Sequence, residues 1–198
     1  MPNALQEQFG NIDIYLFDQI LRGRVPPGAR IFDAGCGGGR NLVWFVRNGY
    51  EVFGNDADPR AVEAVRRMTP SSDFRVEAVE ASSFADSSAD VAIASAVLHF
   101  ARDDRQWRAM VDATWRVLRP GGLLFCRLAS TIGIESQVRR IDGRRFDLPD
   151  GSERYLVDEE LLMRTTAELG GELADPLKTT VVQNQRSMTT WVLWKGRG

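Results

Sequence analysis

The stretch DAGCGGG, residues 33–39, decides the fold, because it ends an apolar run and opens a helical one through glycines. Residues 30–34 predict a short first strand, and residues 41–48 predict the helix that follows the loop. Glycines there allow a tight turn and let the backbone approach a ligand closely. Their spacing is GxGxG, and Arg40 stands where the dinucleotide pattern GxGxxG has its third glycine. The stretch therefore predicts a ligand-binding strand–loop–helix unit.

Strand-like and helix-like segments alternate along the rest of the chain, which is typical of an α/β fold. Further strands are expected at residues 51–55, 74–79, 90–95 and 123–128. Further helices are expected at residues 12–21, 59–68, 105–118 and 158–169. A turn is expected at 119–122, and residues 130–155 show no clear period. The segments 178–183 and 189–194 predict a terminal hairpin, whose last strand is reversed because hairpins are antiparallel. The predicted fold is α/β: a three-layer, doubly wound, mostly parallel seven-stranded sheet with a reversed terminal strand.

The composition is that of a soluble globular protein, with 43% hydrophobic and 26% charged residues among 198, enough for a single domain over 1–198. The net charge of −2 argues against a duplex nucleic-acid binder, which usually displays a basic excess. No apolar run approaches the ~20 residues that span a bilayer, and residues 1–10 lack a signal-peptide pattern. Cys36 and Cys126 form no CxxC pair, so no metal site is expected, and no disulfide is expected because Cys36 lies in the glycine loop and Cys126 in an apolar run. A reducing, cytoplasmic compartment is the expectation.

Carboxylates near the glycine loop suggest a ligand that carries an amino group and a diol. Asp33 precedes the first glycine by two positions, where a carboxylate would repel a pyrophosphate but suits a cationic amino group. Asp56 ends the second strand, where α/β cofactor folds place the acid that binds ribose hydroxyls. Its other possible role, capping the next helix, suits Asp58 better. Glu80, after the third strand, faces either an adenine edge or solvent.

Four segments together resemble class I (Rossmann-like) S-adenosylmethionine-dependent methyltransferases of the small-molecule type. IFDAGCGGGRN at 31–41 is similar to their motif I, and VFGNDADP at 52–59 to their second-strand motif. Residues 86–100 are similar to the fourth-strand block, and LRPGG at 118–122 to the turn before the fifth strand. The segments occur in the family's order. The chain departs from the family in the third-strand region, where Val79-Glu80 replaces a frequent Gly-Asp pair.

The resemblance implies S-adenosylmethionine as cofactor and methyl transfer to a small-molecule acceptor. It places Asp33 and the glycine loop near the methionine part, Asp56 at the ribose, and Glu80 with Ala81 near adenine. The cofactor-binding residues that it implies are Asp33, Gly35, Cys36, Gly37, Gly39, Asn41, Asp56, Ala57, Glu80, Ala81, Ser95 and Ala96.

His99, the only histidine, is the candidate catalytic residue, because it follows the fourth strand at the edge where open α/β sheets bind ligands. It is a general base, a hydrogen-bonding partner of the substrate, or a loop residue that packs over the methionine part. A base is needed only if the accepting atom is protonated. Acceptor recognition is expected from residues 1–22 and 130–155. The second segment is either a solvated loop of mixed charge or a lid that closes over a small acidic substrate.

Two other interpretations stay open from the sequence. A NAD-dependent oxidoreductase shares the first strand, the loop and the acid after the second strand, although Arg40 and the terminal hairpin argue against it. A cofactor-binding module without turnover would carry the same motifs, because a fold and a cofactor site do not establish catalysis.

Overall fold

The computed structural model describes residues 4–196, so residues 1–3 of the expected N-terminal segment lie outside the described part. The strands are β1 Arg30–Ala34, β2 Glu51–Asp56, β3 Phe74–Val76, β4 Ala89–Ser95, β5 Leu118–Ala129, β6 Arg139–Asp142, β7 Arg145–Asp147, β8 Glu153–Tyr155, β9 Gly171–Leu173, β10 Lys178–Val182 and β11 Arg186–Lys195. The α-helices are α1 Ala4–Phe9, α2 Ile14–Leu21, α3 Val43–Arg47, α4 Pro59–Met68, α5 Asp104–Val117 and α6 Glu159–Glu168. Two short 3₁₀ helices are η1 Val79–Ala81 and η2 Leu98–Phe100.

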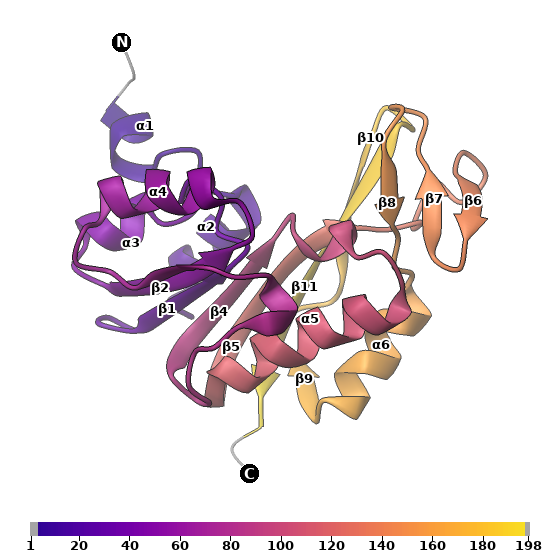
Figure 1. The fold of residues 1–198 in the computed structure, drawn as a ribbon. Coiled ribbons are helices and arrows are strands. Elements are labelled where there is room, and N and C mark those ends of the chain that lie inside the picture. The colour runs from indigo at the N-terminus through magenta and orange to yellow at the C-terminus, as the bar shows by residue number, and fades with distance from the viewer. Residues whose placement is uncertain (1–3, 197–198) are drawn as a thin grey trace.

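One twisted sheet runs through the middle of the molecule (Figure 1). Its strand order is β10-β11-β5-β4-β1-β2-β3, and β9 adds an eighth strand by pairing with β11. The strands from β5 to β3 pair in parallel, whereas β11 runs antiparallel to both β5 and β10. The predicted mostly parallel sheet with a reversed strand from a terminal hairpin is therefore confirmed. The short strand β9 was not predicted.

Helices cover both faces of the sheet, because side chains of successive strand residues alternate between the faces. Phe32 packs in an apolar cluster with Trp107 of α5 and Leu162 of α6, on one face. Its neighbour Ile31 packs in a second cluster, with Phe45 of α3 among the helices of the other face. The three-layer arrangement follows directly from this alternation.

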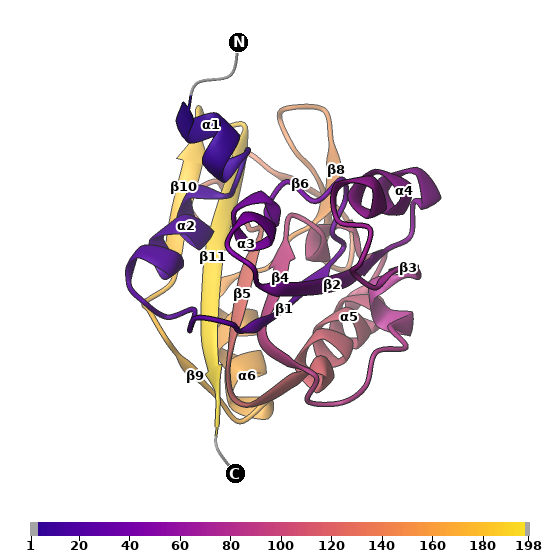
Figure 2. The same ribbon diagram turned by 90° about the vertical axis from the view of Figure 1, so that its left-hand side faces the viewer.

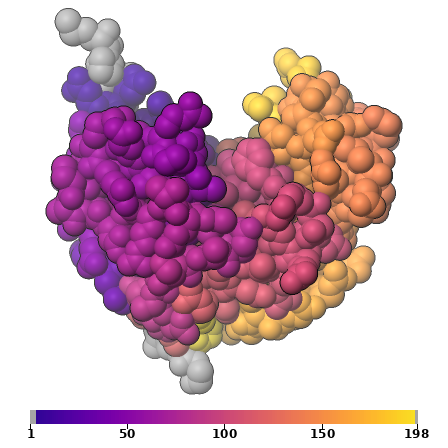
Figure 3. Space-filling model, viewed as in Figure 1, coloured from indigo at the N-terminus to yellow at the C-terminus, as the bar shows by residue number. Residues whose placement is uncertain are grey.

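The order of the strands reverses at β1, which lies between β2 and β4. Connections leave β1 and β4 on opposite sides, so a crevice opens outside the carboxyl ends of these strands. The space-filling view shows the molecule hollowed there, between its indigo-to-magenta part and its orange part (Figure 3). The fold thus places a ligand-sized hollow next to the glycine loop.

Helix α4 begins and ends where its sequence predicts. The Asp58 carboxylate accepts a hydrogen bond from the Arg60 backbone N–H at 2.9 Å and caps the helix. Helix α3 is shorter than the predicted 41–48, and Gly49 follows it with a φ of 74°. The third strand is also shorter than the predicted 74–79. The Glu77 N–H still bonds to the carbonyl of Asp56, but β2 ends there and leaves later residues without a strand to pair with.

Two expectations for the second half of the chain were wrong. Residues 119–122 form no turn before the strand but lie inside β5, which pairs with β4 through a register shift next to Ala89. Residues 130–155 are not an irregular loop, because they contain the antiparallel sheet β6-β7-β8. Acidic and basic side chains of that segment face one another across its strands, and Arg139, for example, pairs with Asp147. This cross-strand pairing explains why the segment has similar numbers of both charges.

The N-terminal helices lie beside the C-terminal hairpin, although the two are far apart in sequence (Figure 2). The hydroxyl of Tyr15 on α2 is 2.6 Å from Oγ1 of Thr180 on β10. Helix α1 was not predicted, because six residues are too few for a clear apolar period. Helix α2 is therefore held against the C-terminal hairpin on this side of the molecule.

Candidate functional site

The glycine loop at the end of β1 has a backbone that other residues could not adopt without strain. Gly35 has a φ of 68°, and a Cβ atom built there would lie 2.3 Å from Cγ2 of Val97. The Cys36 N–H donates to the carbonyl of Asn55 at 3.0 Å. The loop is thus held between the end of β2 and the segment after β4, and only glycine fits at its first position.

Asp56 lies at the end of β2 and turns its carboxylate toward the loop. Its Oδ2 accepts a hydrogen bond from the Gly37 N–H at 2.8 Å, and its Oδ1 accepts one from the Asp58 N–H at 2.9 Å. Each carboxylate oxygen has a second lone pair for another donor. The backbone therefore fixes the orientation of this carboxylate and leaves it able to accept hydrogen bonds from a ligand.

A cavity of about 560 Å³ opens at this edge of the sheet. It brings together most of the predicted cofactor residues: Gly35, Cys36, Gly37, Asn41, Asp56, Ala57, Glu80, Ser95 and Ala96. Cavities that hold cofactors are typically 300–1,000 Å³. The residues that the sequence singled out from four separate segments thus line one space of suitable size.

Three predicted residues do not line this cavity. Gly39 instead faces α4, where a Cβ atom would lie 2.8 Å from Cγ2 of Val65, so its absent side chain allows the loop and helix to pack. Ala81 is exposed at the end of η1. Asp33 is buried within β1.

The Asp33 carboxyl group is the most unusual polar group near the cavity. Its side chain is 2% exposed, and its Oδ2 has no hydrogen-bond partner in the described part of the chain. Burial raises the pKa of Asp33 to about 7, while the Arg40 guanidinium opposes this rise and the Asp56 carboxylate adds to it. Buried polar atoms usually have a partner, so an oxygen without one marks a carboxyl group that would gain from a hydrogen-bond donor.

Several cavity residues were missed by the sequence analysis. Arg40 donates from Nη2 to Oγ of Ser95 at 3.1 Å and from Nη1 to the carbonyl of Asn11 at 3.2 Å. Gln106 of α5 donates to Oε1 of Glu80 at 2.6 Å and lines the cavity together with Met110. Gln106 and Met110 lie four residues apart on one helix face, but that spacing is common to any amphipathic helix and carries no specific signal.

His99 lies against a second, smaller cavity of about 290 Å³, and not against the first. Its ring is buried, and its Nδ1 accepts a hydrogen bond from the Ala129 N–H at 3.3 Å. Burial, with a smaller contribution from the charge of Arg154, lowers the pKa of His99 to about 4. The imidazole is therefore neutral at pH 7, and with Nδ1 accepting, its proton is on Nε2.

Ala96 lines both cavities and has a backbone conformation that is rare for a residue with a side chain. Its φ is 62°, and its N–H donates to the carbonyl of Arg127 at 2.7 Å. Strained residues of this kind cost about 1–3 kcal/mol and persist where the surrounding structure holds them. The surrounding structure thus holds the backbone between the two cavities in one conformation.

The strand order and the glycine-loop cavity define the fold of the class I S-adenosylmethionine-dependent methyltransferases. A family model described as a methyltransferase domain matches residues 32–126. A ubiquinone biosynthesis O-methyltransferase of Cereibacter sphaeroides is 34% identical over 115 residues, which cover 56% of this chain and 45% of that protein. The chain spans about half the length of such curated relatives.

Solved structures agree with this assignment of the fold. A S-adenosylmethionine-dependent methyltransferase from Methanosarcina mazei superposes with a TM-score of 0.76 at 20% identity, covering 90% of this chain and 98% of that one. The 1,6-didemethyltoxoflavin-N1-methyltransferase of Burkholderia thailandensis, solved with its substrate and S-adenosylhomocysteine, gives 0.69 at 17% identity, covering 98% and 81%. The resemblance to small-molecule class I methyltransferases is confirmed, and the NAD-dependent alternative is not favoured.

Two kinds of feature are absent from residues 4–196. No helix there is long and apolar enough to cross a membrane. No group of three or more His, Cys, Asp or Glu side chains in that range could hold a metal ion.

Proposed function

We propose that this chain transfers a methyl group from S-adenosylmethionine to a small-molecule acceptor. The observation that carries the proposal is the pair of carboxylates at the glycine loop. Asp33 has a buried oxygen without a partner, and the Asp56 carboxylate is held in place by the Gly37 N–H. One carboxylate suits a cationic amino group, and the other suits a diol.

The residues in and beside the larger cavity fit this cofactor, although Asp33, Gly39 and Ala81 do not line the cavity itself. Asp33 and the loop from Gly35 to Gly39 would hold the methionine part, and Asp56 would accept hydrogen bonds from the ribose hydroxyls. Glu80, bound to Gln106, and the backbone near Ala81 would face the adenine. S-adenosylmethionine supplies an electrophilic methyl group on a sulfonium that is its own leaving group.

The contribution of the protein is then mainly alignment. Holding two reactants in the right geometry lowers a barrier by roughly 7–11 kcal/mol. The fixed backbone at Gly35 and Ala96 gives the rigidity that such alignment needs. Ala96 lies between the two cavities, so we place the acceptor in the smaller cavity, beside the methyl group.

We propose that His99 donates a hydrogen bond to the acceptor and is not a general base. Its Nδ1 is already occupied by the Ala129 N–H, and its pKa of about 4 keeps the ring neutral. The neutral ring then has a proton on Nε2 and no free lone pair to receive another. Of the roles that the sequence left open, hydrogen bonding to the substrate has this support.

Residues 1–22 and 130–155 are proposed to cover the acceptor, within a single domain over 1–198. The first segment reaches the site through Asp13, whose N–H donates to Oδ1 of Asn41 at 3.0 Å. The second contributes Leu148 and Arg154 to the smaller cavity. The two buried, unpaired thiols support a reducing, cytoplasmic compartment.

Calorimetric titration with S-adenosylmethionine and S-adenosylhomocysteine tests the proposal. We expect saturable binding by the wild type and at least about tenfold weaker binding by Asp56→Ala, which loses charge-assisted hydrogen bonds. Asp73→Ala is the matched control, because Asp73 is an exposed acid paired with Arg75, outside both cavities. Absence of binding by folded wild-type protein would overturn the proposal. Binding without any methylated product across a broad acceptor panel would favour the module without turnover.

A further inference from the structure

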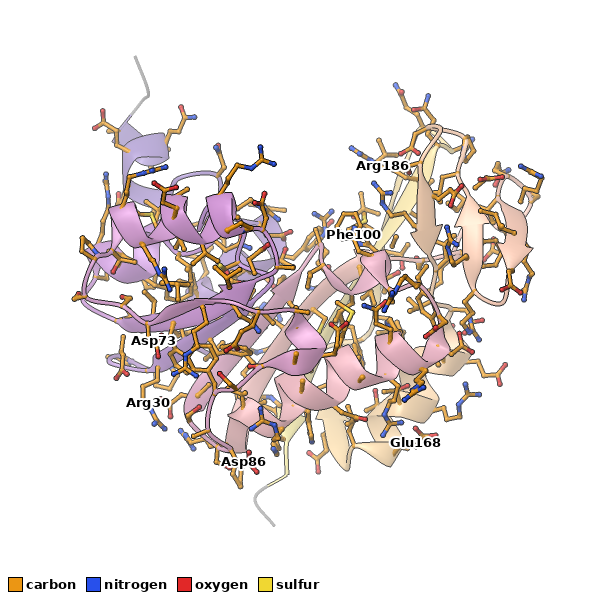
Figure 4. The ribbon with its side chains drawn as sticks, viewed as in Figure 1. Arg30, Asp73, Asp86, Phe100, Glu168 and Arg186 are labelled. Carbon is orange, nitrogen blue, oxygen red and sulfur yellow. The ribbon has the colours of Figure 1, made fainter. Side chains whose placement is uncertain are left out.

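The smaller cavity is built from segments that are far apart in the sequence. The end of β4 contributes Ala96, β5 contributes Arg127, the turn between β7 and β8 contributes Asp150, and the β10–β11 hairpin contributes Arg186. Figure 4 shows Arg186 reaching from the hairpin toward the hollow in which Phe100 also lies. The cavity is thus closed by parts of the fold that do not belong to the cofactor motifs.

Arginines dominate the charge of this cavity, which Arg127, Arg154 and Arg186 line. Neither Arg154 nor Arg186 forms an ion pair with any carboxylate of residues 4–196. The side-chain hydrogen bond of Arg154 goes to a backbone carbonyl, that of Glu153, at 2.6 Å. On the same small sheet as Arg154, Arg139 and Arg145 do form ion pairs, with Asp147 and Glu153.

The acids near the cavity leave an excess of one positive charge. Asp13 accepts a hydrogen bond from Arg127 at 3.1 Å and offsets that arginine. Asp150 accepts hydrogen bonds from the N–H and hydroxyl of Ser152, and these, with weaker attraction from Arg186 and Arg154, lower its pKa. Asp150 therefore offsets one more arginine, and His99 is neutral. The cavity has the charge to bind a monoanion.

Arg154 also connects the two cavities. Its guanidinium carbon lies 4.9 Å from the centroid of the Phe100 ring, and Phe100 lines the larger cavity. The ring centroids of Phe100 and His99 are 4.7 Å apart. A group bound by Arg154 is therefore close to the edge where the acceptor and the cofactor would meet.

We propose that the methyl acceptor is a small molecule with one carboxylate, which binds between Arg154 and Arg186 in the smaller cavity. The guanidinium fork matches a carboxylate in geometry, and the partly enclosed cavity strengthens the attraction. The Nε2–H of His99 adds a donor. Leu148, Val182 and Met188 would contact an apolar body, and a volume of about 290 Å³ restricts its size. That the bound anion is the methyl acceptor rests on the proposed function, whereas the anion site itself does not depend on turnover.

Direct binding tests the anion site without requiring catalysis. Benzoate, phenylacetate and hexanoate are titrated into the protein alone and into the protein with excess S-adenosylhomocysteine, and each is compared with its primary amide by calorimetry and ligand-observed NMR. We expect each acid to bind at least tenfold more tightly than its amide. Equal binding of acids and amides, or no saturable binding of any acid, overturns the inference.

Variants then locate the site. Arg154→Gln and Arg186→Gln should each weaken carboxylate binding about tenfold and reduce the preference for acid over amide, with cofactor affinity unchanged. Arg139→Gln is the matched control, because this exposed arginine of the same small sheet lies outside the cavity. Carboxylate affinity that is the same in all three variants overturns the assignment to these arginines. Thermal melting of each variant distinguishes a lost contact from a lost fold.

The outcomes separate the two proposals. Cofactor binding without carboxylate binding refutes the anion site and leaves methyl transfer standing. Carboxylate binding by a chain that binds no S-adenosylmethionine refutes the proposed function and leaves the anion site standing. When both bind, methylated product from acids and not from amides supports the carboxylate as the acceptor's anchor, and equal turnover of both overturns it.

Discussion

Asp13 and Arg127 lie 114 positions apart, and Nη1 of Arg127 donates a hydrogen bond to Oδ2 of Asp13 at 3.1 Å. The other oxygen of Asp13 accepts from the Tyr15 N–H at 3.0 Å and caps α2. The Asp13 side chain is 1% exposed, so one buried carboxylate both starts the N-terminal helix and fixes it to the end of β5. The helix is thereby held beside the site.

Asp13→Ala should lower the free energy of unfolding by about 3–5 kcal/mol. It leaves the largely buried Arg127 without its charge partner and removes a helix cap. Urea unfolding followed by circular dichroism measures the change. Asp18→Ala, on the same helix, is the control, because its ion pairs with Arg22 and Lys178 are exposed to solvent and should matter little. Equal losses in both variants would contradict a special role for Asp13.

Asp33→Asn should change how stability depends on pH. The folded pKa of about 7 lies about three units above the ordinary value of 3.8, so folding favours the protonated carboxyl. The stability that Asp33 contributes is fully present below pH 4 and is lost as the pH rises to about 7. The unfolding free energy of the variant minus that of the wild type should therefore grow by about 4 kcal/mol between pH 4 and 8. A constant difference would show that Asp33 has an ordinary pKa.

His99→Gln should keep most of the turnover, because an amide N–H can replace the Nε2–H of a neutral imidazole as a donor. His99→Ala should lose tenfold or more in kcat/KM, with cofactor affinity unchanged in both. Steady-state kinetics with a verified acceptor and calorimetry with S-adenosylhomocysteine provide these numbers. A glutamine variant as inactive as the alanine variant would instead indicate a general base.

Gly35→Ala should weaken both the fold and cofactor binding. The new Cβ would meet Val97 at 2.3 Å in addition to the strain of a positive φ. Gly28→Ala is the matched control, because Gly28 has a φ of 73° with nothing within 4 Å of a Cβ atom. The control isolates the strain of about 1–2 kcal/mol, and any further loss measures the contact with Val97. Equal losses in thermal unfolding would mean that the contact relaxes at no cost.

The lining of the larger cavity was largely predictable because its signals are local. A glycine loop after a strand, and an acid at the end of the next strand, are close in sequence to the elements that place them. Helix α4 was predicted to the residue for the same reason, since Asp58 and Pro59 mark its start. Neighbouring residues are enough for a prediction where a single turn sets both the backbone conformation and the side chains that line the cavity.

The lining of the smaller cavity could not be predicted in this way. Arg154 and Arg186 come from different sheets and lie 32 positions apart in the sequence, with no motif that links them. Their position beside Arg127 depends on how β6-β7-β8 and the β10–β11 hairpin are placed against the main sheet. Gly39 illustrates this limit of local signals, because it belongs to the motif but faces α4 and not the cavity. A motif identifies the residues that a loop requires, but not which of them contact the ligand.

Ala96 alone among the described residues lines both cavities. The two sets of lining residues therefore share one residue, and they contact each other where the Phe100 ring meets Arg154 and His99. Exchange of the turn at 148–152 and the hairpin tip at 183–187 for other sequences would alter one cavity and leave the glycine loop and Asp56 untouched. Grafting those two short segments is therefore the direct route to engineering a new acceptor preference while the cofactor-binding residues stay the same.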